Sequence, residues 1–371
     1  MLFRAGSAIS VVGLFAKRSK RRTRNVRARI ENLWLMEEES MLYNSKYLAF
    51  GMAMVAAGVS GLFAPQAKAD VILYATGRTG QIGQISKVNV TLNTVTVIDS
   101  VQDVNPDSLI FANNTTLLYT NFDGGHGQVR KVNTDGTGDA LILGNFNGPA
   151  DLCLTPGGVD MMFSDFGAGI IYRIASPLTS PASSVLAGPS AAIGPNPEGI
   201  LFTPNGNLYA NIGTRDAGAD KWVSKLDPVT GAVLASSAHF QGLDGLTYDP
   251  TTGFLFATER DSSKLLKIDP TNLNSTTEIN FVDSFGQPVS QIDGLEADGL
   301  GNLFIASNVT QRIYEYRISD GAIIYTSPII NGLDDLAPVV GFGSQTPEPA
   351  SLSLLAVGVS GLMLRRSRRS A

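Results

Sequence analysis

The chain has 371 residues and a formal net charge of −5, but its charges are unevenly distributed. Residues 70–364 carry 13 basic and 29 acidic side chains, whereas residues 1–40 carry nine basic side chains and residues 365–371 carry four. A body with an excess of 16 acidic groups argues against nucleic-acid binding, which requires a basic surface. The single cysteine, Cys153, excludes an intramolecular disulfide.

Residues 41–69 have the pattern of a secretory signal peptide. Lys46 supplies the positive charge, residues 47–64 are apolar, and small residues, Ala67 and Ala69, occupy the positions that signal peptidase recognises. We therefore predict cleavage by signal peptidase after Ala69 and export across the inner membrane. A transmembrane anchor is the alternative interpretation of the same apolar stretch.

The basic segment 1–40 is unusual ahead of a signal peptide, and Met41 would give the signal a normal start. We expect residues 1–40 to lie upstream of the true start of translation. An extended cytoplasmic n-region is the alternative.

The body, residues 70–344, repeats a short motif in which an acidic or polar pair precedes an apolar residue. Its six copies are Pro106–Leu109, Pro149–Leu152, Pro197–Ile200, Leu243–Leu246, Ile292–Leu295 and Leu333–Leu336. Their spacings are 43, 48, 46, 49 and 41 residues, and each of the first five copies is followed by a turn and further short strands. Four strands in about 45 residues are typical of a β-propeller blade.

The two ends of the body are incomplete repeats. Residues 71–100 offer three strands without a first one, and residues 331–341 offer a first strand with nothing after it. Together they make one blade. The sequence therefore predicts an all-β, six-bladed β-propeller, closed by a blade that the N- and C-terminal ends of the body share, which protects the sheet edges.

The acid of each motif copy is the best candidate for a functional site. In chain order these acids are Asp107, Asp151 (displaced by one position), Glu198, Asp244, Asp293 and Asp334. If the first strands line the central channel, these carboxylates form a ring at one mouth. Converging carboxylates raise one another's pKa or bind a cation, and oxygen ligands suit Ca²⁺ or Mg²⁺. The alternative is structural, because an Asp before Gly often caps a turn.

Other catalytic signatures are missing. The two histidines, His126 and His239, fall in different predicted blades. A dinucleotide-binding loop must be followed by a helix, and no helix is predicted after the glycines of 77–83. Trp222 lies in a predicted third strand, which favours packing over sugar stacking. We predict no catalytic residue and no cofactor apart from Ca²⁺.

Residues 293–316 resemble an NHL repeat, and the repeat pattern of 71–341 also resembles the gluconolactonase-like (regucalcin) superfamily. The second resemblance implies metal ligands at the blade heads: one Glu, one Asn and one Asp from different blades. Glu198, Asp244 and Asp293 match by position, whereas the family's Asn has no clear equivalent.

The C-terminus consists of Pro347, Glu348 and Pro349, an uncharged apolar stretch 350–364, and four arginines: Arg365, Arg366, Arg368 and Arg369. As a helix, these fifteen residues would span roughly 22 Å, whereas a permanent membrane anchor needs about 20 residues. The arginines would stay on the cytoplasmic side. This order resembles the PEP-CTERM sorting signal, which implies an exosortase-like membrane enzyme as partner and a bacterium that makes exopolysaccharide or biofilm matrix. A plain C-terminal tail anchor is the alternative.

These patterns predict an exported protein, anchored transiently through its C-terminal segment 345–371 and then present at the cell surface or outside the cell. We expect a non-enzymatic protein that binds polysaccharide or a surface protein. A divalent-metal-dependent lactonase or related hydrolase and a calcium-stabilised scaffold are the alternatives.

Overall fold

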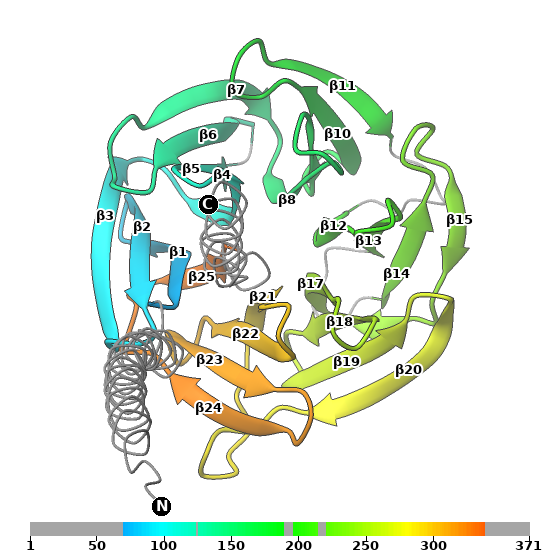
Figure 1. The fold of residues 1–371 in the computed structure, drawn as a ribbon. Helices are drawn as coiled ribbons and strands as arrows, with labels where there is room; N and C mark the ends of the chain where they lie inside the picture. Colours follow the sequence, from blue (N-terminus) through cyan, green and yellow to red (C-terminus); the bar gives the residue numbers. More distant parts are fainter. Residues whose placement is uncertain (1–69, 124, 189–195, 214–219, 338–371) are drawn as a thin grey trace, which may run out of the picture. The chain divides into compact units, whose positions relative to one another are not determined.

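The computed structural model describes residues 70–123, 125–188, 196–213 and 220–337. These residues form 25 strands in six antiparallel sheets that surround a central channel (Figure 1). The six-bladed all-β propeller predicted from the repeats is therefore confirmed. The apolar helix expected at 350–364 lies outside the described residues.

Each blade runs outward from the channel in strand order. The shared blade consists of Leu333–Leu336 (β25), Ile72–Thr79 (β1), Ile82–Asn89 (β2) and Thr94–Gln102 (β3). The second consists of Pro106–Asn113 (β4), Thr116–Asn121 (β5), Gly127–Asn133 (β6) and Ala140–Phe146 (β7). The third consists of Pro149–Leu154 (β8), Met161–Asp165 (β9), Ile170–Ala175 (β10) and Ala182–Ala187 (β11).

The remaining three blades follow the same order. The fourth consists of Ile200–Phe202 (β12), Leu208–Gly213 (β13), Asp220–Leu226 (β14) and Val233–Ser236 (β15), with Phe240–Gln241 (β16) paired to β14 as an unpredicted addition. The fifth consists of Leu243–Asp249 (β17), Phe254–Glu259 (β18), Lys264–Asp269 (β19) and Asn272–Asn280 (β20). The sixth consists of Ile292–Ala297 (β21), Asn302–Ser307 (β22), Arg312–Arg317 (β23) and Ala322–Thr326 (β24).

The shared blade closes the ring as the sequence predicts. Strand β25 pairs antiparallel with β1, so that Leu333 lies opposite Gly77 and Leu336 lies opposite Ala75. The C-terminal end of the body thus becomes the innermost strand of a sheet whose other three strands come from its N-terminal end. Leu333 and Leu336 are both buried, and the pairing removes the edge that β1 would otherwise expose.

The hydrophobic core lies between neighbouring blades. Strand β13 shows why: Leu208, Ala210 and Ile212 pack against the third blade, whereas Tyr209, on the opposite face of the strand, packs against the fifth. Alternate side chains of a strand point to opposite faces of its sheet. Because each blade has a neighbouring blade on both sides, such a strand must carry apolar side chains on both of its faces. This accounts for the continuous apolar runs that mark the second strand of each repeat.

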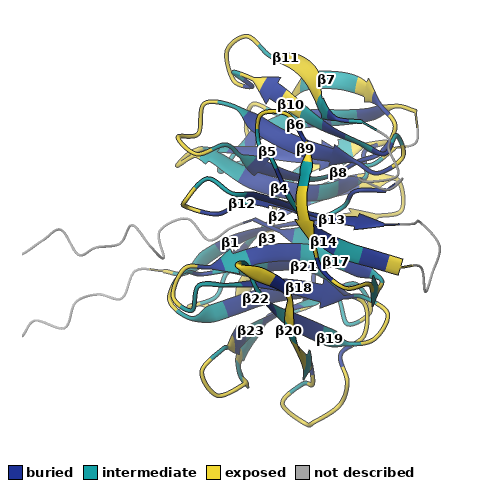
Figure 2. Cartoon of the chain, turned by 90° about the vertical axis from the view of Figure 1, so that its right-hand side faces the viewer, coloured by how far each residue is buried: buried dark blue, intermediate teal, exposed yellow. Residues whose placement is uncertain are grey.

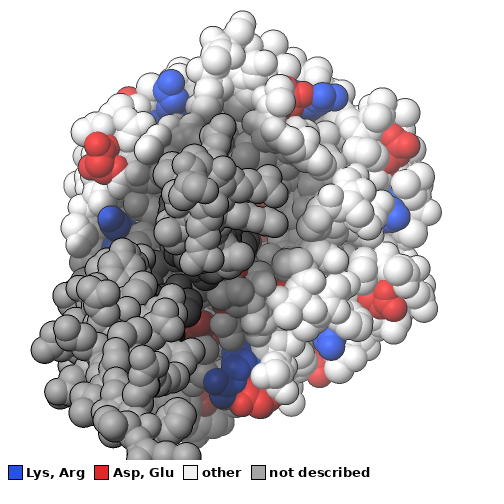
Figure 3. Space-filling model, in the orientation of Figure 1, with Lys and Arg blue, Asp and Glu red and all other residues white. Residues whose placement is uncertain are grey.

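The outermost strands are exposed. The residues of β3 and β20 are exposed or half-buried, apart from the buried Leu273 in β20, and the burial colouring of Figure 2 places exposed residues on the outer strands and turns. Charged side chains of both signs are spread around the rim of the face seen in Figure 3. The described part of the propeller thus has a polar periphery around six apolar interfaces.

Candidate functional site

A β-bulge at the head of the inner strand positions the candidate acids in five of the blades. In the fifth blade, Asp244 and Gly245 together lie opposite Thr258, between the pairs Leu243–Glu259 and Leu246–Ala257. The same two-against-one irregularity occurs at β4, β8, β21 and β25. An extra residue re-aims the side chains of the bulged strand.

In the fourth blade, the corresponding pair stands directly before β12. The backbone of Asn211 there accepts from Glu198 N–H (3.0 Å) and donates to the carbonyl of Gly199 (2.7 Å). The six pairs are Asp107–Ser108, Ala150–Asp151, Glu198–Gly199, Asp244–Gly245, Asp293–Gly294 and Asp334–Asp335.

The first residue of each pair faces a cavity of about 750 Å³, which we call the upper mouth. Its lining includes all six first residues: Asp107, Ala150, Glu198, Asp244, Asp293 and Asp334. Both residues of each pair surround a narrow waist of about 40 Å³ below it. A second cavity of about 360 Å³, the lower mouth, continues on the other side and is lined mainly by apolar residues such as Phe111 and Phe202.

The structure brings five of the six candidate acids to the upper mouth and excludes Asp151. The motif of the third blade carries its acid one residue later, so Ala150 takes the first position of the bulge and Asp151 the second. Because successive side chains point to opposite sides of a strand, that shift of one moves the carboxylate to the waist. The inclusion of Asp151 in a single ring was therefore wrong.

Polar bonds between blades hold the paired residues in place. Thr258 Oγ1 accepts the backbone N–H of Gly245 in its own blade (2.8 Å) and donates to the carbonyl of Asp293 in the next blade (3.0 Å). Equivalent side chains in four other blades donate to the first residue of the next blade's pair; they are Thr76, Thr120, Ser164 and Asn211. The sixth blade has Ala306 at this position, which has no hydroxyl. We call this set the cross-blade bonds.

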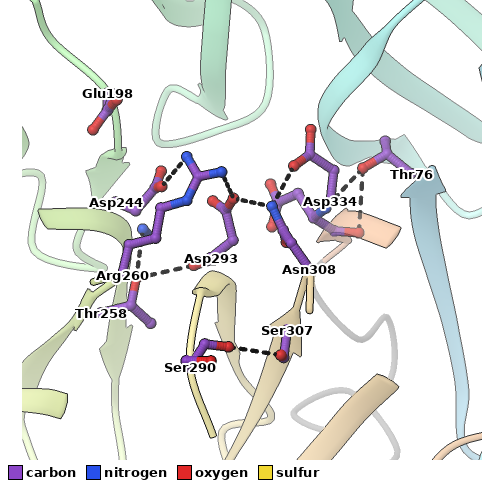
Figure 4. A network of polar contacts seen from close by, with 12 residues as sticks. Thr76, Glu198, Asp244, Thr258, Arg260, Ser290, Asp293, Ser307, Asn308 and Asp334 are labelled. Carbon is purple, nitrogen blue, oxygen red and sulfur yellow. Dashed lines mark hydrogen bonds and ion pairs between the residues drawn. The ribbon is translucent and has the colours of Figure 1, made fainter. Parts of the chain in front are cut away.

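Cationic and amide side chains lie between the acids of the upper mouth (Figure 4). Arg260 Nη1 lies 3.3 Å from Asp244 Oδ2, and its Nη2 lies 3.6 Å from Asp293 Oδ2. Asn308 Nδ2 donates to Asp293 Oδ2 (2.6 Å) and to Asp334 Oδ1 (3.1 Å).

Lys221 is the third side chain, after Arg260 and Asn308, that contacts an acid of the upper mouth. Its Nζ forms an ion pair with Glu198 Oε2 and donates to the carbonyl of Leu243 at 2.7 Å. Together, these three side chains contact four neighbouring acids that come from three blades and the shared blade: Glu198, Asp244, Asp293 and Asp334.

Burial dominates the electrostatics of the upper mouth. It raises the pKa of Glu198 to about 8, with a further rise from Asp244, and outweighs the opposing effect of Lys221. It raises the pKa of Asp293 to about 6, and the charge of Asp334 adds to this shift. Burial and the adjacent Asp334 also raise the pKa of Asp107 well above its usual range. Several of these carboxyls therefore retain protons at pH values where an exposed carboxyl is ionised.

The rim of the upper mouth is formed two residues after each cross-blade position. The residues there are Arg78, Phe122, Phe166, Gly213, Arg260 and Asn308. Gly213 leaves the space that Lys221 fills, because a Cβ on Gly213 would lie 2.5 Å from Lys221 Cγ. Phe122 and Phe166 are neighbours, with ring centroids 6.0 Å apart, so the rim has one aromatic arc and one cationic arc.

The residues of this rim were not predicted from the sequence. They come at the end of the second strand, some 15 residues after the motif, and their types differ from blade to blade. The available signal was positional: in five of the six repeats the rim residue comes two places after a Thr, Ser or Asn of the second strand, and in the sixth it comes two places after Ala306.

Three further carboxyls lie at the waist. Asp151 Oδ1 accepts from Ser108 Oγ (2.6 Å), and Asp151 Oδ2 accepts from the backbone N–H of Ile200 (2.7 Å). These bonds connect three consecutive blades. Burial raises the pKa of Asp151 to about 6, and burial followed by the charge of Asp151 raises the pKa of Glu296 and Asp335.

The three acids predicted as metal ligands already have positively charged partners. Glu198 accepts from Lys221, and Arg260 lies between Asp244 and Asp293. Within the described ranges, no group of three or more His, Cys, Asp or Glu side chains has an arrangement that could hold a metal ion. With Lys221 and Arg260 in place, these residues do not fit a divalent cation.

The aromatic and histidine features noted in the sequence lie away from the upper mouth. Trp222 packs against the core between the third and fourth blades and stacks on His239, with ring centroids 4.8 Å apart. Cys153 is buried at the same interface.

Comparison with known proteins identifies the C-terminal segment. Residues 345–369 match the PEP-CTERM protein-sorting motif, which confirms the resemblance seen in the sequence and implies that the protein is exported. The signal-peptidase residues Ala67 and Ala69, like the sorting segment itself, lie outside the described residues. No curated protein matches the sequence.

Solved structures share the fold at low identity. A propeller in a nidogen/laminin complex superposes with a TM-score of 0.57 at 16% identity, covering 72% of this chain and 98% of that one. A gluconolactonase from Xanthomonas campestris gives 0.53 at 15% identity, covering 74% and 91%. Hydrazine synthase from Kuenenia stuttgartiensis gives 0.52 at 13% identity, covering 68% and 83%. At such identities the similarity shows the propeller fold alone.

Among the residues that the structure describes, there is no helix of the length and apolarity needed to cross a membrane. The described elements are all strands and their connections.

Proposed function

We propose that this protein is an exported, non-enzymatic binding propeller that holds a polyhydroxylated ligand, such as a segment of extracellular polysaccharide, at its upper mouth. The sorting motif supports recognition and processing by an exosortase-like membrane enzyme, once the chain has been exported and the signal peptide 41–69 has been removed. The final location under this proposal is the cell surface or the surrounding matrix.

The composition of the upper mouth carries the proposal. A cavity of about 750 Å³ lies within the range of small-molecule sites, which combine apolar walls with a few fixed polar groups. The ring pair Phe122–Phe166 offers an apolar surface for the C–H face of a sugar. Asp293, Asn308 and Arg260 already form a network of donors and acceptors, whose hydrogen bonds a ligand's hydroxyl groups can extend.

Glycan binding tests this function directly. Binding of the purified protein to an array of bacterial polysaccharide fragments is measured first, and the best ligand is then titrated by calorimetry. We expect Phe122→Ala to weaken binding by about tenfold or more, the loss of roughly one aromatic contact. Phe285→Ala is the matched control, because Phe285 is 86% exposed and does not line the cavity. Failure of the wild-type protein to bind any fragment would refute the proposal.

A hydrolase acting on lactones or related compounds is the second candidate. The observation in its favour is the group of buried carboxyls with raised pKa, such as Glu198 at about 8, since a general acid works best when its pKa is near the operating pH. Proton release from a panel of lactones, measured in the wild type and in Asp244→Asn, distinguishes the two. Turnover that disappears in the variant would favour the enzyme.

A further inference from the structure

Three carboxylates of the upper mouth surround positions that side-chain cations already fill. Arg260 projects from the end of β18 between Asp244 and Asp293, at 3.3 and 3.6 Å, and Lys221 reaches Glu198 from β14 (Figure 4 shows the Arg260 part). The side chain of Lys221 is 10% exposed and that of Glu198 is 15% exposed. The Lys221–Glu198 contact therefore forms in a largely desolvated place, and the carboxylates that Arg260 contacts are also mostly buried, at 17% and 14% exposed; a buried charge must be compensated nearby.

We infer that Arg260 and Lys221 stand in for a divalent cation, so that the upper mouth works without metal and becomes a Ca²⁺ site when these two charges are removed. The inference extends the proposed function, because it predicts that ligand binding at the upper mouth does not depend on divalent cations. It does not require the ligand to be known, since the cation itself is the probe.

Geometry and charge support the inference that these side chains take the place of a divalent cation. The guanidinium offers two nitrogens to two carboxylates from neighbouring blades, which is the role that one divalent ion plays when it bridges carboxylates. Arginine stays protonated at all accessible pH values, so it compensates the acids permanently. Asp293 Oδ2 is shared between Arg260 and Asn308, so removal of the guanidinium frees it to face Asp244.

The chain also shows how Lys221 reaches the site. Gly213 occupies the rim position of the fourth blade, and any side chain there would collide with the Lys221 stem and with the carbonyl of Asp220, which a Cβ would approach to 2.6 Å. The lysine thus enters the mouth from a neighbouring strand through a gap that only glycine leaves.

Calorimetric titration of the purified full chain with CaCl₂ after chelation tests the inference. We expect no saturable binding in the wild type. The double variant Arg260→Gln, Lys221→Met should bind one Ca²⁺ with a dissociation constant of about 10⁻⁴–10⁻³ M, as extracellular calcium modules do. Arg317→Gln is the matched control, because Arg317 forms an ion pair with Asp320 at 2.7 Å in an exposed turn; it should bind like the wild type.

The single variant Arg260→Gln serves if the double variant fails to fold, since the Arg260 side chain is 41% exposed and its loss disturbs packing less. Saturable Ca²⁺ binding by the wild type that Asp244→Asn abolishes would overturn the inference. So would a folded Arg260→Gln variant that gains no Ca²⁺ affinity. If the variants gain Ca²⁺ while no saccharide binds to the wild type, the cation substitution stands and the proposed function fails.

Discussion

Because of the cross-blade bonds, we expect the removal of one hydroxyl group, that of Thr258, to lower the free energy of unfolding strongly. Thr258 is fully buried, and its hydroxyl serves Gly245 in one blade and Asp293 in the next. Thr258→Val keeps the shape of the side chain and removes both bonds. A buried polar group left without a partner costs about 1–3 kcal/mol, so the loss of partners for both the N–H of Gly245 and the carbonyl of Asp293 should lower the free energy of unfolding by about 2–6 kcal/mol.

Urea unfolding, followed by fluorescence and by far-UV circular dichroism, measures this loss if the two transitions coincide. Thr277→Val on the exposed strand β20 is the control and should change the free energy of unfolding by less than about 0.5 kcal/mol. A Thr258→Val protein that unfolds within about 0.5 kcal/mol of the wild type would refute the reasoning, because the bulges would then be held by other contacts.

Three further perturbations follow from the same site. Gly245→Ala should destabilise the protein by about 1–3 kcal/mol in urea, because its Cβ would lie 2.4 Å from the carbonyl of Asp293; a neutral effect would show that the blades can separate. Stability should fall as pH rises from 4 to 7, since the folded state holds protons on carboxyls with raised pKa that the unfolded state has lost. Asp151, whose pKa is raised to about 6, contributes about 2 kcal/mol to that fall. Asp151→Asn should flatten the profile by this amount in urea unfolding measured at several pH values, and an unchanged slope would contradict the assignment. A chain that ends at Asn331 lacks β25 and should lose cooperative thermal unfolding, whereas one that ends at Ser344 retains it; equal melting curves would argue against closure by the shared blade.

The repeat pattern was sufficient for the fold. The motif spacing, the missing first strand at residue 71 and the surplus strand at 333 together define six blades and the closure, because each repeat buries its apolar faces only against neighbouring repeats. No comparable pattern marks β16. It is two residues long, follows β15 in the chain and pairs with the start of β14, where Gln241 lies opposite Asp220 and Phe240 lies opposite Lys221.

The candidate site was predictable in part. The acids of the upper mouth repeat with the blades, so Asp244 and Asp293 can be found from the sequence. The sequence does not show the β-bulges, however, and a shift of one residue within a bulge moves a side chain from the upper mouth to the waist, as at Asp151. Arg260 and Lys221 were missed for a different reason. They belong to other strands than the acids they contact, and Lys221 depends on the absence of a side chain at Gly213, which only the three-dimensional structure reveals.

The strand that completes the ring is also the one closest to the sorting signal. Eight residues, 337–344, separate the end of β25 from the matched motif. If the chain is exported from its N-terminus, the N-terminal three strands of the shared blade emerge first, and the ring cannot close until residues 333–336 follow them. A force on the C-terminal side would act directly on β25, the innermost strand of the shared blade. The seam between β25 and the sixth blade lacks a cross-blade bond because of Ala306, although Asn308 Nδ2 donates across it to Asp334 Oδ1 (3.1 Å). If the sorting enzyme cuts the chain at the motif, as we propose, the cut would also end any force on β25, and sorting would release the closed ring.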